Sequence, residues 1–211
     1  MTASAKRDFR NQPLLALIDR ELGTNTELKD GCSAYVSIID AWRRSKDDGA
    51  LVEDMIDFAA WRYRQAGNAQ AGLFEFDDGS TDFLFDMGHE RVVAAWARSR
   101  SVAANSRDNA YHAGFPSAGA GHDKGHLMGH AQGGREGGPN YIRQARRLNQ
   151  ARSNNGKLWR AIETYLAANA GLFALVRLIY AKGDTGTTPS HIEYCLFSAE
   201  GQFRAVIFPN S

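Results

Sequence analysis

Three amphipathic segments in the first third of the chain predict helices. The first opens at Pro13 and is followed by Gly23, a proline and glycine pairing that is typical of the start and end of a helix. In each segment the defining residues recur every three or four positions, so they fall on one helix face. These residues are Leu14, Leu17, Ile18 and Leu22; Tyr35, Ile38 and Trp42; and Leu51, Met55, Phe58 and Arg62.

The pattern changes after Gly67-Asn68. Residues 73–76 and 83–85 are rich in Phe and Leu and flank the turn sequence Asp77-Asp78-Gly79-Ser80, which predicts two strands joined by a turn. Residues 89–98, which include Val92, Val93 and Trp96, predict a further helix. Residues 99–121 are polar and glycine-rich without periodicity, so we expect a loop there.

The last part of the chain predicts one helix followed by three strands. Asn154-Asn155 is a helix-capping signal before the apolar residues Leu158, Ile162 and Leu166, and the helix is expected to end near Gly171. Apolar or alternating residues then occupy 172–180, 191–197 and 202–208, with turn-rich segments between them. Three consecutive strands of this kind predict an antiparallel meander. The whole pattern predicts an α+β protein with an N-terminal helical segment (1–69) and a second domain (70–211).

Length and charge narrow the possible functions. The 211 residues suffice for a substantial apolar core. The formal net charge is only +1, so affinity for nucleic acid has to come from a local cluster of cations. A run of this kind is also typical of a solvated helix face. The cluster consists of Arg135, Arg143, Arg146, Arg147, Arg152, Lys157 and Arg160.

Nothing in the sequence indicates a disulfide framework or a membrane partner. Cys32 and Cys195 have neither a neighbouring cysteine nor a metal-ligand spacing. The first residues lack the apolar core of a secretory signal peptide, and no apolar run approaches the length needed to cross a bilayer. We therefore expect a soluble protein that is cytoplasmic in the cell that makes it, and that needs a specialised secretion route if it is exported as an effector.

The stretch His122-Asp123-Lys124-Gly125-His126-Leu127 carries the strongest chemical signal. Hydrolysis of a phosphodiester needs an activated water, stabilisation of charge on the phosphoryl oxygens and help for the departing oxygen. The neutral imidazole of His126 can accept a proton near neutral pH. Lys124 supplies a cation, and Gly125 lets the backbone approach a phosphate closely. The side-chain carbonyl of Asn149 suffices for Mg²⁺, which keeps most of its waters.

These residue types, in this order, resemble the DNA/RNA non-specific endonuclease family, whose ββα-metal site carries an Asp-Arg-Gly-His signature. The order is similar to that of the streptococcal-type secreted nucleases and of nuclease toxins in the same superfamily, over roughly residues 110–211. The matching residues are Asp123-Lys124-Gly125-His126, Leu127-Met128-Gly129-His130, Gly133-Gly134, Asn140, Gln144, Asn149, Trp159, Glu163, Leu175 to Tyr180, Pro189-Ser190-His191-Ile192-Glu193 and Gly201.

The resemblance implies a ββα-metal (His-Me finger) nuclease core on an antiparallel sheet. It implies His126 as the general base and Asn149 as the direct ligand of Mg²⁺, for which Mn²⁺ can substitute. Glu163 is implied as the acidic helix residue that holds metal-bound water, and Asp123 as an orienting partner of the histidine segment. The implied site-shaping residues are Asn140 and Gln144, and the expected substrate-binding cations are Lys124, Arg143, Arg146 and Arg147.

Two positions depart from the family pattern. Lys124 stands where the family usually has arginine, and lysine keeps the charge but loses the bidentate fork. We therefore expect retained but weaker orientation of the phosphate. Ala167 stands where some relatives carry an arginine one helical turn after the acidic residue. The cations that could compensate for it are Arg143, Arg146 and Arg160.

Two other interpretations remain compatible with the sequence. His122, His126 and His130 recur every four residues, which is the spacing of zinc ligands on one helix face in a Zn²⁺-dependent hydrolase. Three glycines in the same stretch disfavour a helix, and Leu127 does not supply the Glu of the zincin motif. Alternatively, the basic segment belongs to a non-catalytic nucleic-acid-binding protein, whose affinity would fall steeply with salt.

The function that we predict is metal-dependent endonucleolytic cleavage of DNA, with RNA as a further candidate substrate and with little sequence preference. Low preference is expected because the metal, the base and the lysine all address the phosphate. Such an enzyme harms the cell that makes it, so we expect an antibacterial toxin or effector paired with an immunity protein. The N-terminal helices then either serve delivery or contact with that inhibitor, or form an integral part of the nuclease core.

Overall fold

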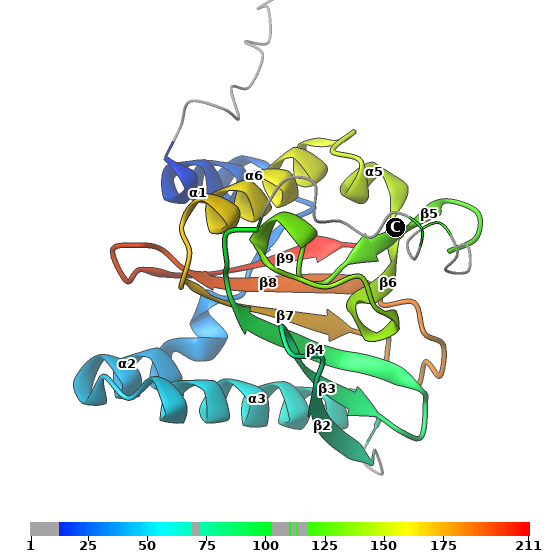
Figure 1. Ribbon diagram of the computed structural model, residues 1–211, viewed down its shortest axis with the longest axis horizontal. Coiled ribbons are helices and arrows are strands. Elements are labelled where there is room, and N and C mark those ends of the chain that lie inside the picture. The colour runs from blue at the N-terminus through cyan, green and yellow to red at the C-terminus, as the bar shows by residue number, and fades with distance from the viewer. Residues whose placement is uncertain (1–12, 69–71, 103–109, 111–112, 114–117) are drawn as a thin grey trace, which may run out of the picture.

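The computed structural model describes residues 13–68, 72–102, 110, 113 and 118–211, and it shows helices packed on both faces of one antiparallel sheet (Figure 1). The sheet has seven strands in the order β1-β9-β8-β7-β4-β3-β2. The three predicted C-terminal strands form its centre as an antiparallel meander. The strands are β1 (Lys29–Asp30), β2 (Leu73–Asp77), β3 (Asp82–Asp86), β4 (Arg91–Arg98), β7 (Phe173–Ile179), β8 (His191–Phe197) and β9 (Phe203–Pro209).

Two pairs of helices enclose this sheet. Helices α1 (Leu14–Thr24) and α6 (Asn154–Ala168) lie on one side, and α2 (Val36–Ser45) and α3 (Asp48–Gln65) lie on the other, where η1 (Cys32–Tyr35) leads into α2 (Figure 1). The three predicted N-terminal helices and the predicted α6 are therefore present. Among the helices of the described residues, none combines the length and the apolar character that crossing a membrane requires.

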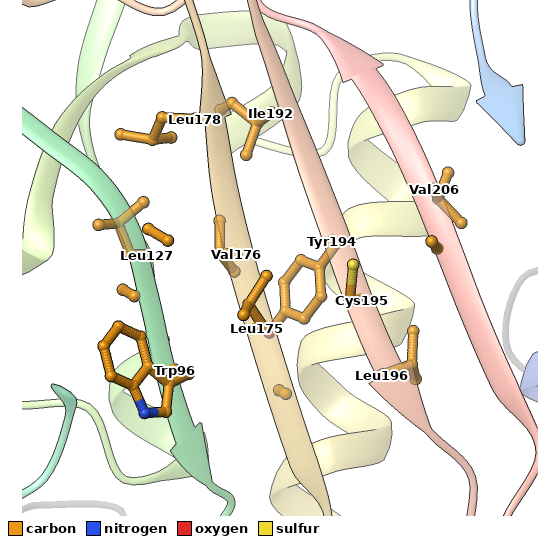
Figure 2. Packing of buried hydrophobic residues seen from close by; sticks show 14 of the residues in the cluster. Trp96, Leu127, Leu175, Val176, Leu178, Ile192, Tyr194, Cys195, Leu196 and Val206 are labelled. Atoms are coloured by element: carbon orange, nitrogen blue, oxygen red, sulfur yellow. The ribbon is translucent and has the colours of Figure 1, made fainter. Parts of the chain in front are cut away.

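Aromatic side chains fix each helix layer to its face of the sheet. On the α6 face, the Trp159 ring packs edge-on against Tyr194, with ring centroids 5.0 Å apart. On the α2 face, the Trp42 ring lies 4.8 Å from Phe197. Strand residues alternate between these two layers, so Tyr194 and its neighbour Cys195 belong to different faces and are both buried (Figure 2). Trp159, which the sequence places in the core, is 1% exposed.

A buried polar network links the N-terminal segment to the sheet. Glu193 on β8 accepts hydrogen bonds from the Tyr35 hydroxyl at 2.6 Å and from Arg177 Nε at 2.7 Å. Burial acts to lower the pKa of Arg177, but the Glu193 carboxylate outweighs it and raises that pKa above its usual value. Each charged group is thus satisfied by an opposite one, which is the condition for charges to be tolerated in a core.

The N-terminal helices share a hydrophobic cluster with the strands. Strand β1 pairs with β9, and α1 contacts both α6 and β9. Residues on both sides of the boundary expected at residue 69, such as Leu17, Met55 and Leu175, belong to the same cluster. Both faces of the sheet are therefore covered by chain from the N-terminal segment.

Two local predictions are wrong. Residues 91–98 form strand β4 rather than a helix, and six consecutive residues of this strand are buried. A strand covered on both faces has no polar alternation, so its apolar run cannot be distinguished from a buried helix by periodicity. The cap of α6 is Ser153, whose hydroxyl accepts a hydrogen bond from Gly156 N, whereas Asn155 binds Asn25 and Glu27. The loop expected at 99–121 lies largely outside the described residues.

Candidate functional site

A small β-hairpin followed by helices carries most of the predicted site residues. Strand β5 (His122–His126) pairs antiparallel with β6 (Tyr141–Ala145), and α5 (Arg146–Asn149) packs against both strands and against α6. Between the strands lie the short helices η2 (His130–Gln132) and η3 (Gly138–Asn140). The hairpin and the following helices form a ββα unit beside the main sheet (Figure 1). The predicted α+β class with a ββα unit is confirmed.

Strand alternation divides the histidine motif between two faces of the hairpin. Lys124 and His126 lie on one face, because they are two residues apart in β5. Their partners in the register are Arg143 and Tyr141 on β6. Asp123 lies on the opposite face, towards the helices. The structure therefore brings the predicted base and the predicted phosphate-binding cation to one surface.

Gly125 is required for a reason that differs from the predicted one. A Cβ atom at this position would lie 2.1 Å from Gln144 Oε1. The space beside Gly125 is thus filled by the side chain of Gln144, which is fully buried. Packing inside the hairpin therefore requires glycine at this position, and the approach of a phosphate to its backbone stays a prediction.

Asp123 connects the histidine strand to the helix that carries Asn149. Its carboxylate accepts hydrogen bonds from Arg146 Nε at 3.0 Å, Gln150 Nε2 at 2.7 Å and Asn149 Nδ2 at 3.2 Å. Burial acts to raise the pKa of Asp123, but these three hydrogen bonds outweigh it and hold the pKa below its usual value. Asp123 thus orients the Asn149 amide through its nitrogen. Gln150 is a further anchor of this carboxylate that the sequence did not suggest.

His126 pairs with an acidic residue that the sequence analysis missed. Its Nε2 atom lies 2.9 Å from Glu136 Oε2, and the hydroxyl of Tyr141 donates to the same carboxylate oxygen. The side chains of His126 and Glu136 are 11% and 4% exposed. The rings of His126 and Tyr141 are in edge-on contact, with centroids 4.9 Å apart. The only signal for Glu136 in the sequence is that it stands alone as an acid between Gly133-Gly134 and Gly137-Gly138.

Glu163 is a residue of α6, and its side chain lies against the chain that follows β5. Trp159 Nε1 donates to its Oε1 atom at 3.0 Å, as expected for residues one helical turn apart. A Cβ atom at Gly129 would lie 3.1 Å from the same oxygen. Burial raises the pKa of Glu163, although the charge of Arg160 acts against this. Arg160 Nη1 is 3.3 Å from Glu163 Oε2, and Arg160 Nη2 donates to the Asn149 backbone carbonyl at 3.3 Å.

Glu163 and Asn149, both contacted by Arg160, carry side-chain oxygens of the kind that bind a hydrated divalent cation. Glu163 Oε2 is buried and accepts no hydrogen bond from the described residues. The Asn149 amide is held by its nitrogen, and among the described residues its side-chain oxygen has no hydrogen-bond donor. Hard divalent cations bind such carbonyl and carboxylate oxygens. Arg160 places a positive charge next to Glu163, and its side chain is 59% exposed.

The arrangement of the histidines does not support a helical zinc site. His122 and His126 occupy the two ends of strand β5, and His130 begins η2, so the helix face required for ligands four residues apart is absent. Across the described part of the chain, no group of three or more His, Cys, Asp or Glu side chains is placed to hold a metal ion.

Asn140 shapes the turn between the histidine strand and Glu136. It is fully buried, and its Oδ1 atom accepts a hydrogen bond from Met128 N at 2.9 Å. Its Nδ2 atom donates to the carbonyls of Met128 and Arg135, both at 2.9 Å. Gln144 is also buried, and neither polar atom of its side chain has a hydrogen-bond partner among the described residues. The two predicted site-shaping residues thus both lie inside the hairpin.

The predicted substrate-binding cations lie in different places. Lys124 and Arg143 face each other across the hairpin and line a cavity of about 380 Å³ between the hairpin and the main sheet. Tyr141, Ile142 and Tyr180 also line this cavity. Arg146 is on the other side, bound to Asp123. Arg147 donates to the carbonyl of Ser211 at 2.8 Å and lies 3.6 Å from Glu27.

Comparison with known proteins gives fold likenesses only. No family model matches the sequence, and no curated protein matches it. Among solved structures, the chain is similar to the Sda1 nuclease with bound zinc ion, with 18% identity, a TM-score of 0.35 and coverage of 43% of this chain. The match spans about two fifths (39%) of the length of that nuclease.

A second similar structure is that of the EndoG/EndoGI complex, with 14% identity and a TM-score of 0.46. The match covers 65% of this chain and 74% of the other one. Because both TM-scores lie below 0.5 and both identities below 25%, these likenesses assign no activity to the protein.

Proposed function

We propose that this protein is a divalent-metal-dependent endonuclease that hydrolyses phosphodiester bonds of DNA, and of RNA as a second substrate. One observation carries the proposal. His126 and Lys124 share one face of β5, while Asp123 on the other face of the same strand holds Asn149. A proton acceptor, a phosphate-binding cation and a neutral oxygen ligand are thereby positioned by five consecutive residues.

In the proposed reaction, His126 accepts the proton of a water molecule as the water oxygen attacks phosphorus. The bond from phosphorus to the 3′ oxygen breaks, so the products carry a 5′-phosphate and a 3′-hydroxyl, whose proton comes from solvent. Lys124 and Arg143 bind the non-bridging oxygens of the phosphate. Mg²⁺, or Mn²⁺ in its place, would be held by Asn149 and through water by Glu163, and would neutralise negative charge that develops on the departing oxygen.

The cations on the His126 face support an anionic ligand. Lys124 and Arg143 are direct partners in the antiparallel register, and like charges in such positions repel each other. A bound phosphate would place negative charge beside both cations and offset this repulsion. These groups contact the phosphate and not a base edge, so the proposed cleavage has little sequence preference.

Arg160 is the cation that we propose in place of the arginine expected at position 167. It contacts both Glu163 and the carbonyl of Asn149, whereas Arg143 lies at the cavity and Arg146 is bound to Asp123. An exposed arginine at this point can move between Glu163 and the phosphate of a bound substrate.

Digestion of plasmid DNA and of RNA by metal-stripped protein tests the proposed function. Added Mg²⁺ or Mn²⁺ is expected to restore cleavage, and EDTA to abolish it. His126→Ala should lower the rate by about 10²-fold to 10⁴-fold, the usual contribution of a general base. Asn149→Ala should lower the apparent affinity for the added metal. His122→Ala is the matched control, because His122 lies on the same strand face without contacting Glu136 in the described structure.

Several outcomes would contradict the proposal. Retention of cleavage in His126→Ala, or a strict requirement for Zn²⁺, would exclude the proposed chemistry. Salt-sensitive binding of DNA without any cleavage by the wild-type protein would instead identify a non-catalytic binding protein.

For the biological role, we propose a nuclease toxin or effector that is paired with an acidic inhibitor. A nuclease with little sequence preference damages the genome of its producer unless its phosphate-binding cations are covered. An acidic protein surface that binds Lys124, Arg143 and Arg160 would do this. Expression of the wild-type gene alone in bacterial cytoplasm, beside His126→Ala, tests this role. Equal growth of both strains would contradict it even if the purified protein cuts DNA.

A further inference from the structure

We infer that Glu136 is a positioning residue for His126, and that it sets which ring nitrogen of this histidine takes part in the reaction. The inference rests on the proposed function for its catalytic meaning, but the pairing itself is independent of that function. It is carried by two contacts of one buried carboxylate, with His126 Nε2 at 2.9 Å and with the hydroxyl of Tyr141.

The backbone that carries Glu136 is fixed on both sides. Asn140 Nδ2 donates to the carbonyl of Arg135, the residue immediately before Glu136, and Asn140 N donates to the carbonyl of Gly137, the residue immediately after it. At Gly134, a Cβ atom would lie 1.9 Å from the carbonyl oxygen of Met128, so this turn requires glycine to lie against the end of β5. The carboxylate is therefore held beside His126 by the turn.

The low exposure of Glu136 makes its partners energetically important. A carboxylate that is 4% exposed carries a large desolvation cost unless hydrogen-bond donors or an opposite charge compensate for it. A carboxylate only accepts hydrogen bonds, so the proton between Glu136 and His126 belongs to Nε2. In the neutral ring of His126, the lone pair is then on Nδ1. We therefore assign Nδ1 as the atom that accepts the proton of water.

Tyr141 completes the support of the imidazole. Its hydroxyl binds the carboxylate and its ring contacts the His126 ring edge-on, so the same residue restrains both partners. Among the described residues, the charged or titratable side chains on this face of the hairpin include Glu136, Lys124, Arg143 and His122. The two cations favour the neutral imidazole, whereas Glu136 favours the protonated one. Removal of the Glu136 charge therefore has a predictable direction.

Substitution Glu136→Gln tests the inference, because it keeps the shape of the side chain and removes its charge. The first readout is NMR of the His126 imidazole in free protein, assigned by the signal that disappears in His126→Ala. We expect the Nε2-protonated form in the wild type. We also expect the midpoint of the His126 titration to fall by about one pH unit or more in Glu136→Gln, the shift that one adjacent opposite charge produces.

The second readout is the pH dependence of cleavage. In Glu136→Gln the acidic limb of the rate profile should move to lower pH, with kcat reduced by about tenfold to 100-fold and KM changed by less than about threefold, as for other residues that orient a catalytic group through one hydrogen bond. Glu136→Asp keeps the charge and should restore the titration midpoint in part. Glu53→Gln on the exposed side of α3 is the control with equal loss of charge.

The results separate failure of this inference from failure of the proposed function. If His126 titrates identically in wild type, Glu136→Gln and Glu53→Gln, the inference is wrong, whatever the enzyme does. If the NMR shift is found but no nucleic acid is cut by the wild type, the pairing stands and the nuclease proposal falls. Far-ultraviolet circular dichroism of each variant identifies misfolding. If Glu136→Gln is misfolded, the His126 titration of Glu136→Asp is compared with that of the wild type instead.

Discussion

Two buried glutamates in this protein have the same kinds of partner and differ in what they do. Glu193 accepts hydrogen bonds from Tyr35 and Arg177 in the layer between the sheet and the N-terminal helices. Glu136 accepts hydrogen bonds from Tyr141 and His126 at the end of the hairpin. In the part of the chain that the structure describes, each network thus joins a carboxylate, a phenol and a basic side chain, and each glutamate side chain is at most 4% exposed.

The basic partner and its surroundings decide the difference. Arg177 remains charged at every accessible pH, and its network joins β7, β8 and η1 inside the core. His126 can exchange its proton near neutral pH, and it shares a strand face with Lys124, which lines a cavity. A permanently charged pair holds elements together, whereas a titratable pair next to an opening can take part in proton transfer.

The largest expected effect is on stability, and it distinguishes the two networks. Glu193→Gln leaves Arg177 charged and buried without its counter-ion, so we expect a loss of about 3–5 kcal/mol in the free energy of unfolding. Glu136→Gln should cost less than about 2 kcal/mol, because His126 can lose its proton when the carboxylate is absent. Urea denaturation of both variants beside Glu53→Gln measures the difference. If Glu193→Gln and Glu136→Gln lower the free energy of unfolding equally, the proposed difference between the two networks is wrong.

A smaller effect is expected at Asp123, which is more exposed than either glutamate, with 18% of its side chain accessible to solvent. Hydrogen bonds from Arg146, Asn149 and Gln150 outweigh the effect of burial and lower its pKa in the folded protein. The associated stability is therefore present above the pKa of the unfolded chain, about 3.9, and is lost as the pH falls through the lower pKa of the folded state.

Asp123→Asn should remove this contribution. Because solvent screens a partly exposed group, we expect a loss below about 1 kcal/mol at pH 7 and a weaker dependence of stability on pH below pH 4. Thermal unfolding between pH 2 and pH 7 measures both quantities. A variant that loses stability as steeply as the wild type on acidification would show that Asp123 is not the titrating group.

The smallest expected effect concerns Lys124. Lys124→Arg introduces a bidentate donor on the His126 face, without changing the charge. On the scale of one exposed charge contact, about 0.5 kcal/mol, the expected gain in kcat/KM for DNA cleavage is roughly twofold. Steady-state cleavage of a short duplex measures it, with Lys157→Arg as the control on an exposed position of α6. A loss of activity would mean that the hairpin fits lysine specifically.

The comparison also explains which parts of the site were accessible to sequence analysis. Lys124 and His126 are two residues apart, so their common face follows from strand periodicity once the segment is known to be a strand. The hydrogen bond from Asn149 to Asp123 spans 26 residues; the family resemblance pointed to both residues but did not predict this contact. Glu136 belongs to no periodic pattern, because a glycine-rich turn folds it back onto the end of β5.

Errors in the fold prediction have an equally local cause. The one-sided apolar periodicity of the helices identified them, whereas the three strands of the meander were identified by apolar or alternating residues with turn-rich segments between them, although β7 and β8 are buried along almost their whole length. Strand β4 is likewise buried over most of its length, since α3 covers one face and further chain covers the other. Its three alanines and two valines therefore suited a helix as well as a strand.

The sequence by itself determined the α+β composition, most of the helices and strands, and the residue types available for phosphate chemistry, because these depend on patterns within about ten neighbouring residues. Only the tertiary structure decided that Glu136 meets His126, that Gln144 fills the space beside Gly125, and that Arg160 lies between Asn149 and Glu163. These contacts depend on the register of β5 with β6, on the packing of α5 and α6, and on one buried turn. Such distances between residues remote in the chain are set by the packing of the whole molecule.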